Sequence, residues 1–147
     1  MDEQMMRLAL EEAKKAAAME ETPVGAVVVC DGKVVASAHN EREALLDITA
    51  HAELTAIRAA AKVLGNWRLS DCTVYVTLEP CPMCAGALIS ARVGRVVYGA
   101  KDAVAGAMGS VLNLPRYPLG AYPVVEGGVL EAPCREILQD FFRQRRK

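Results

Sequence analysis

The chain has 147 residues and a formal net charge of −1, from 17 basic and 18 acidic side chains. This length fits one compact domain, and we expect residues 1–147 to form it. Apolar residues make up 52% of the chain, which provides material for a hydrophobic core. The near-neutral charge excludes a broadly basic, histone-like binder, so any positive surface for a nucleic acid must be local.

The sequence predicts a cytoplasmic protein without a membrane partner. No apolar run approaches the ~20 residues of a membrane span, and no signal-peptide core follows the acidic start, Met1 to Gln4. In the reducing cytoplasm, the five cysteines are expected to stay free of disulfides. We therefore interpret them as core residues or metal ligands.

The N-terminal part predicts a helix followed by a hairpin. Apolar residues recur at a spacing of three and four between Met6 and Ala17, and Pro23 ends this helix. Two runs rich in β-branched residues follow, Val24 to Cys30 and Lys33 to Ser37. They flank Asp31-Gly32, and Asp-Gly between apolar runs is the strongest short hairpin signal.

The middle of the chain alternates helices and strands. A second helix is expected from about Ala50 to Leu64, with Thr49 as its N-terminal cap. Thr73 to Leu78 predicts a strand. Pro82 suits the first turn of a third helix that runs to about Ala91, and Arg95 to Tyr98 predicts another strand.

The C-terminal part is less regular. Gly99 to Ser110 is rich in glycine and alanine and has no clear period, and Val124-Val125 is a weak strand candidate. A last helix is expected from about Ala132 to Arg146. A hairpin followed by alternating helices and strands indicates an α/β domain whose mixed sheet is covered on both faces.

Two short segments carry candidate chemistry, His51-Ala52-Glu53 and Pro80-Cys81-Pro82-Met83-Cys84. Cys81 and Cys84 are three residues apart at a helix start, so both sulfurs point to the same side. The positive helix end and its free N–H groups favour thiolates there. His51 adds an imidazole from the start of the preceding helix. One imidazole and two thiolates form a ligand set suited to zinc.

The number of ligands indicates the role of the metal. Structural zinc is usually closed by four protein ligands, whereas catalytic zinc keeps a position for water. We find three ligands, so Glu53 becomes the candidate proton carrier beside that water. Residues two apart in a regular helix diverge by about 200°. The pocket must therefore extend over the first helical turn to include both His51 and Glu53.

Each element also has a simpler interpretation. Cys-x-x-Cys alone fits a redox pair, His51 alone a partly buried histidine, and Glu53 alone a solvated helix residue. The two segments together, at successive helix starts, favour a catalytic zinc site. A non-catalytic zinc scaffold stays the alternative of a different class, in which loss of Glu53 would leave function intact.

A fourth ligand would make the site structural. The candidates are His39 and the three remaining cysteines, Cys30, Cys72 and Cys134. We expect the cysteines to be small core or strand-edge residues instead. Trp67, the one tryptophan, is expected to pack at the end of the second helix.

His-x-Glu followed by Pro-Cys-x-x-Cys is the zinc deaminase signature, and the chain resembles bacterial tRNA-specific adenosine deaminases from its first helix to Arg146. The glycine-rich segment and the aromatic-basic end favour this family within the cytidine deaminase-like superfamily. The matching stretches are Pro23–Val27, Asn40, Thr49–Glu53, Tyr75–Cys81, Met83–Ala87, Gly94–Ala100, Asp102, Gly109-Ser110 and Phe141–Arg143.

The resemblance implies a three-layer αβα fold with a five-stranded mixed sheet, assembled as a homodimer. It implies that His51, Cys81 and Cys84 bind Zn²⁺. It further implies hydrolytic deamination of adenosine to inosine at the wobble position of a tRNA anticodon loop, by attack of zinc hydroxide on C6 with Glu53 as proton shuttle.

The resemblance also assigns substrate contacts. Asn40 would hydrogen-bond the target base, and Asp102 would lie near the RNA sugar-phosphate. Arg143 and the basic residues after it either complement the end of the last helix or, beside Phe141-Phe142, face the RNA.

The chain departs from the family pattern at two places. Ala121-Tyr122 stands where the family often has Asn-His, and Val104-Ala105 replaces residues that are frequently more polar. The detailed RNA contacts, rather than the zinc centre, depend on these positions. The nearest alternative is a deaminase of the same fold that acts on a free base or nucleotide, such as guanine or cytosine.

Overall fold

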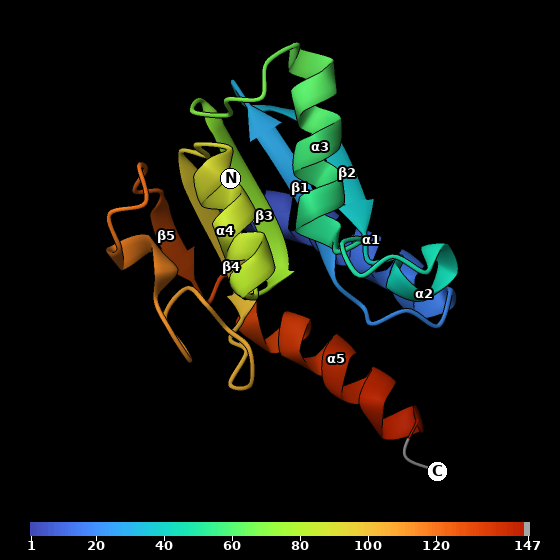
Figure 1. The fold of residues 1–147 in the computed structure, drawn as a ribbon. Coiled ribbons are helices and arrows are strands. Elements are labelled where there is room, and N and C mark those ends of the chain that lie inside the picture. Colours follow the sequence, from blue (N-terminus) through green and yellow to red (C-terminus); the bar gives the residue numbers. More distant parts are fainter. Residues whose placement is uncertain (146–147) are drawn as a thin grey trace.

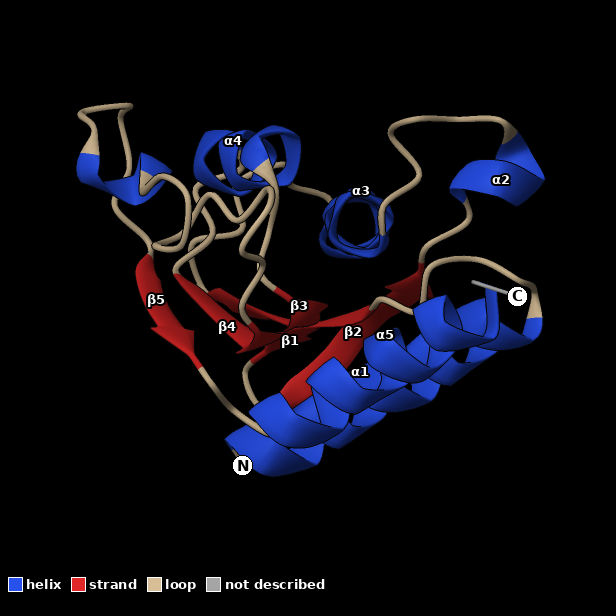
Figure 2. Cartoon of the chain, turned by 90° about the horizontal axis from the view of Figure 1, so that it is seen from below, coloured by secondary structure: helices blue, strands red, loops and turns tan. Residues whose placement is uncertain are grey.

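The computed structural model describes residues 1–145 and shows a central sheet between two helical layers (Figures 1 and 2). The strands are β1 (Gly25–Cys30), β2 (Lys33–His39), β3 (Cys72–Leu78), β4 (Arg95–Ala100) and β5 (Val124–Gly127). The helices are α1 (Asp2–Ala18), α2 (Arg42–Leu45), α3 (Ala52–Leu64), α4 (Pro82–Ser90) and α5 (Glu131–Arg145), with a 3₁₀ turn η1 (Leu114–Arg116).

The sheet has the order β2-β1-β3-β4-β5. β1 pairs antiparallel with β2 and β3, whereas β3 with β4 and β4 with β5 are parallel pairs. Figure 2 shows α1 and α5 on one face of the sheet and α3 and α4 on the other. The predicted αβα arrangement with five strands in a mixed sheet is confirmed.

The predicted hairpin joins β1 and β2. Asp31 and Gly32 both have positive φ, 52° and 74°, and Cys30 pairs with Lys33 across the turn. Two successive left-handed residues match the twist of the flanking strands, which explains the Asp-Gly preference. The register set by this turn runs from Cys30–Lys33 to Val29–Val34 and then shifts between Val28 and Val29.

Each face of the sheet has its own core because side chains alternate along a strand. Val28, Val74 and Val96 pack towards α3 and α4, where small residues such as Ala56 and Ala60 allow close helix approach. The opposite faces of the same strands pack against α1 and α5. That second core contains Met6, Ala9, Val27, Val29, Tyr75, Val97, Ala100 and Cys134.

Two local predictions are wrong. The Thr49 hydroxyl donates to the Asp47 carboxylate at 2.7 Å, and the N-cap of α3 is His51. A nearby carboxylate therefore takes the hydroxyl that would have capped the helix. Trp67 is 57% exposed, with the Arg68 guanidinium 5.1 Å from its ring centroid, because α3 ends at Gly65 and the chain leaves the core there.

A half-buried ion pair joins the N-terminus to the sheet. The Asp2 carboxylate accepts hydrogen bonds from the Arg95 guanidinium at 2.6 and 2.9 Å and from the Tyr75 hydroxyl at 2.7 Å. The hydrogen bond to Arg95 lowers the pKa of Asp2 to about 2.

No helix within residues 1–145 has the length and apolar character needed to cross a bilayer.

Candidate active site

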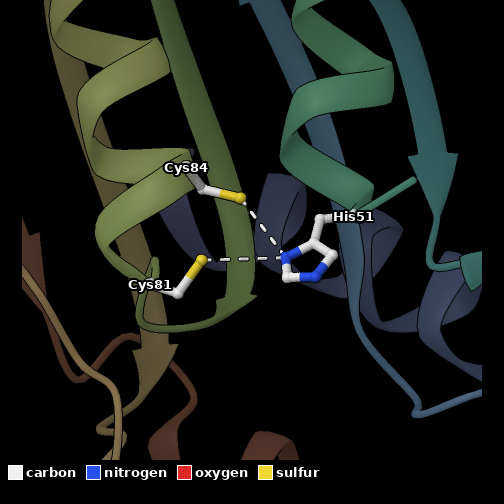
Figure 3. Close-up of side chains that lie close together, drawn as sticks. All are labelled: His51, Cys81 and Cys84. Atoms are coloured by element: carbon white, nitrogen blue, oxygen red, sulfur yellow. Dashed lines mark hydrogen bonds between the residues drawn. The ribbon is translucent and has the colours of Figure 1, made fainter. Parts of the chain in front are cut away.

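The candidate metal site lies between the N-terminal ends of α3 and α4, just beyond the end of β3 (Figure 3). His51 is the N-cap of α3 and Cys81 the N-cap of α4, both with extended backbone, and Cys84 lies within the first turn of α4. Nδ1 of His51 is 3.8 Å from Sγ of Cys81 and 3.4 Å from Sγ of Cys84. The three ligand atoms lie within 4.8 Å of one another, and the described part of the chain holds no second such group.

These separations fit a zinc ion. Tetrahedral zinc with ordinary Zn–N and Zn–S bonds places nitrogen and sulfur about 3.6 Å apart. The two observed separations, 3.4 and 3.8 Å, lie on either side of that value. The three sequence-predicted ligands are therefore brought together in a geometry that zinc can occupy, with one tetrahedral position left for a non-protein ligand.

The surroundings of the two cysteines shift the pKa values of their thiols in opposite directions. Hydrogen bonding from Cys84, and then from His51, lowers the pKa of Cys81 to about 4, so Cys81 is a thiolate at neutral pH. The same hydrogen bond to Cys81, together with burial, raises the pKa of Cys84. A bound dication would allow both sulfurs to ionise, because coordination deprotonates a thiol.

Glu53 lies in the first turn of α3 and lines the same cavity as His51 and Cys81. It is 4% exposed, and burial raises its pKa to about 7. His51 precedes the helix and Glu53 lies inside it, so the extended backbone at the cap lets both side chains reach one pocket. This meets the geometric condition stated from the sequence.

The cavity has a volume of about 180 Å³, which suits one nucleobase rather than a longer segment. Asn40 and Asp102 both line it. The amide of Asn40 is held by Nδ2 donating to the Thr22 carbonyl at 3.3 Å and by Oδ1 accepting from Arg42 N–H at 3.2 Å. Two of the three predicted substrate contacts therefore lie at the cavity.

Arg143 does not line this cavity. Its guanidinium donates to the Asp140 carboxylate at 3.0 Å on the exposed face of α5. It borders a separate groove with Lys101, which directly precedes Asp102. Arg145 donates to the Glu20 carbonyl at 3.0 Å and lies over the Phe141 ring. Arg146 and Lys147, named with the basic end of the chain, lie outside the described residues.

None of the possible fourth ligands lies at the site. Nδ1 of His39 is 3.3 Å from Glu12 Oε1 on the α1 side of the molecule. Cys72 and Cys134 are buried in the two cores, and Cys30 is half-buried at the end of β1. The prediction that these cysteines are core or strand-edge residues is confirmed.

Sequence reasoning missed Glu79. Its carboxylate is 2% exposed and accepts hydrogen bonds from backbone N–H groups of the segment that follows β4. Burial alone would raise its pKa, but the Ser110 hydroxyl and these N–H groups hold the pKa below its ordinary value. One signal in the sequence could have found it. Glu79 lies between a strand and the start of a helix, where a carboxylate is expected to be buried and therefore to need hydrogen-bond donors.

Comparison with known proteins agrees with the site. Residues 1–100 match the family profile of the cytidine and deoxycytidylate deaminase zinc-binding region, which defines the class as zinc-dependent deaminases. The tRNA-specific adenosine deaminase of Bacillus subtilis is 48% identical over 147 residues, 99% of this chain and 91% of that protein. The chloroplastic tRNA(adenine(34)) deaminase of Arabidopsis thaliana is also 48% identical over 98% of this chain, which spans 12% of that much longer protein.

A solved structure is similarly close. It comes from a study of A-to-I editing by tRNA:A34 deaminases at the wobble position of transfer RNA. It superimposes with a TM-score of 0.89 at 45% identity and covers 92% of this chain and 99% of its own. The chain belongs to the tRNA-specific adenosine deaminase family.

Proposed function

We propose that the protein hydrolytically deaminates adenosine to inosine at the wobble position of a tRNA anticodon loop. One observation carries the chemistry: the buried Glu53 carboxyl lines a base-sized cavity together with His51 and Cys81, two of the three residues that form the candidate zinc site. The names of the close relatives supply the substrate, since those proteins are tRNA adenosine deaminases.

The proposed reaction needs an activated water and a group that carries protons, and different residues of the site supply the two. When bound by His51, Cys81 and Cys84, zinc would supply an activated water at neutral pH, because the metal ion lowers the pKa of its bound water towards ~7. Glu53 takes up the proton that this water loses and delivers it to a ring nitrogen of the adenine. A second proton transfer through Glu53, from the oxygen added at C6 to the exocyclic amine, lets the amine leave as ammonia. Burial raises the pKa of the Glu53 carboxyl, which brings it closer to the neutral range that suits a general acid–base group.

Asn40 and Asp102 are proposed to hold the substrate nucleotide. Asn40 lies at the end of β2 and keeps donor and acceptor atoms at the cavity wall, where they can meet the edge of a base. The Asp102 carboxylate accepts from Val104 and Ala105 N–H groups at 3.0 and 3.1 Å, so its orientation is fixed by the backbone that it caps. A base flipped from an already unstacked loop enters at a cost of a few kcal/mol.

The C-terminal half of α5 is proposed to meet the rest of the RNA loop. Phe141, Phe142 and Arg145 line a groove of about 570 Å³ with Thr22 and Arg42, two residues that also line the cavity. Aromatic rings and arginine planes stack with unpaired bases. The groove thus leads from the cavity along α5.

Arg143 lies on the other side of α5. It lines a second groove of about 480 Å³ with Lys101 and Arg135. This concentration of positive charge on a chain of net charge −1 is the kind of local surface that phosphates require. We propose that Arg143 contacts the RNA backbone there.

A homodimer and a cytoplasmic location complete the proposal. Ala56, Ala60 and Ala85 are buried in the chain's own core, so any interface must use other residues. Met83 on α4 and Tyr117 after η1 are exposed apolar side chains on elements that pack together. Light scattering at micromolar concentration should give about twice the 15.8 kDa of one chain; a mass of one chain would contradict the dimer.

The proposed cytoplasmic location is consistent with the cysteines: all five are free, as expected in a reducing compartment.

The test is mass analysis of tRNA after incubation with the purified, zinc-loaded protein. We expect conversion of one anticodon-loop adenosine to inosine, and no conversion by Glu53→Ala at full zinc content. Removing a general acid–base group costs about 10²–10⁴ in rate. Unchanged tRNA with the wild-type protein would refute the proposed function, and a fully active Glu53→Ala would refute the proton-carrier role.

A further inference from the structure

Glu79 ties together both ends of an irregular segment that borders the cavity. We call residues 102–110 the wall loop. Oε1 of Glu79 accepts from Asp102 N–H at 3.1 Å and from the Ser110 hydroxyl, and Oε2 accepts from Met108 N–H at 3.0 Å and Ser110 N–H at 3.1 Å. One buried carboxylate therefore fixes the beginning and the end of the wall loop at once.

The backbone beside Glu79 adds to this attachment. Glu79 N–H donates to the Ala100 carbonyl at 2.8 Å, and the next carbonyl, that of Pro80, accepts from Ala107 N–H at 2.9 Å. The wall loop thus follows the strand end that leads directly into the ligand Cys81. Movement of the loop relative to the metal site would require these long-range hydrogen bonds to break.

The fit leaves no spare room around the carboxylate. A Cβ added at Gly106 would lie 2.5 Å from both Glu79 Oε2 and the Asp102 carbonyl oxygen. The wall loop therefore passes over Glu79 at a position where only glycine fits. Asp102 and Ala105, the two wall-loop residues that line the cavity, lie in the four residues that precede Gly106.

We propose that Glu79 is a positioning residue that sets the affinity for the substrate nucleotide by fixing the wall loop, without a part in the proton transfers. This rests on the proposed function, because the wall loop matters only if a base enters the cavity. Glu79 also lines the cavity, but both of its carboxylate oxygens accept hydrogen bonds from the wall loop, so we expect it to act on the substrate through the loop. Displacing a positioning group by about 1 Å can cost up to ~10²-fold.

The test substitutes Glu79→Gln, which keeps the size of the side chain but places an NH₂ group opposite N–H donors. We expect the zinc content to stay at one per chain, KM for an adenosine-containing anticodon stem-loop to rise about tenfold, and kcat to change less than threefold. Ser110→Ala removes one donor and should move KM the same way by a smaller factor. The stem-loop Kd, measured in a Glu53→Ala background that traps the substrate, should follow KM.

Asp2→Asn is the matched control. It removes a hydrogen-bonded carboxylate on the opposite side of the sheet and should lower stability without changing KM. If Glu79→Gln and Ser110→Ala leave KM and Kd unchanged, or if Glu79→Gln loses zinc or lowers kcat alone, the positioning role is wrong. A wild-type protein that makes no inosine in the stem-loop would instead refute the proposed function.

Discussion

The metal site and the wall loop border one cavity but are built in opposite ways. His51, Cys81 and Cys84 project from the caps and first turns of two regular helices, each within three residues of another part of its motif. The wall loop has no regular structure beyond an isolated bridge, and a carboxylate more than 20 residues earlier in the chain holds it in place. The metal ligands therefore lie on regular helices. The cavity wall formed by the wall loop is held instead by hydrogen bonds between a side chain and the backbone.

Because of this difference, we expect mutations in the two regions to affect different steps, catalysis in one case and substrate binding in the other. Changes in the metal site should remove activity whatever the substrate. Changes in the wall loop should alter how well a substrate is held, because the loop contributes no group to the proton transfers. The following predictions are ordered by the size of the expected effect.

The largest effect is expected for Cys84→Ala. Two protein ligands do not form a stable zinc site, so the variant should lose its zinc and at least about 10³-fold in deamination rate. Metal analysis of the purified protein and inosine formation measure the two losses. Cys30→Ala, which changes a half-buried thiol far from the site, should keep both. Full activity of a zinc-free Cys84→Ala would show that the metal is not catalytic.

Gly106→Ala should have an intermediate effect on the wall loop. The added methyl would collide with the Asp102 carbonyl and with Glu79, at a cost of about 1–3 kcal/mol in stability. We expect KM for the stem-loop to rise while the zinc content stays constant. Gly94→Ala is the matched control, because its methyl would meet the Ser70 carbonyl oxygen at 2.3 Å, at the start of β4 away from the cavity. Equal KM values for the two variants would contradict a special role of the wall loop.

The smallest effect is expected for Asp2→Asn, which touches neither region. The folded-state pKa of Asp2, about 2, lies below the ordinary value of 3.8. The ion pair with Arg95 therefore stabilises the fold above about pH 4, and this contribution is lost as the pH falls through 2. After allowance for solvent screening we expect a loss of about 1 kcal/mol at pH 7. Urea unfolding at pH 7 and near pH 2 measures it; a difference between variant and wild type that does not shrink at low pH would contradict the assignment.

The same contrast explains what the sequence could predict. The zinc ligands and Glu53 were identifiable because short spacings at helix starts determine where their side chains point. The hairpin was identifiable because its turn needs two left-handed residues, which Asp31-Gly32 supplies. The hairpin and the Cys81–Cys84 spacing are local relations, and the structure confirms both. The approach of His51 to Cys81, 30 residues apart, was implied by the family signature and is also observed.

Long-range and competing polar contacts were beyond such reasoning. Glu79 reaches residues 23 to 31 positions later in the chain, and no periodic pattern marks those partners. The cap predicted at Thr49 is wrong because Asp47, two residues away, binds the same hydroxyl. Trp67 is exposed because the chain turns away from the core after Gly65, the left-handed C-cap of α3. For Glu79 and Thr49, the outcome depends on which of several available partners a polar group binds.

The central claim is that the cavity accepts an adenine presented by an RNA loop. The most direct measurement compares kcat/KM of the zinc-loaded wild-type protein for an anticodon stem-loop containing adenosine with that for free adenosine, guanine and cytidine. We predict inosine in the stem-loop and turnover of the free compounds lower by a factor of at least about 10², because the proposed contacts along α5 would be made only by the polymer. Equal or faster turnover of guanine, cytidine or free adenosine would contradict the claim and identify a deaminase of small molecules instead.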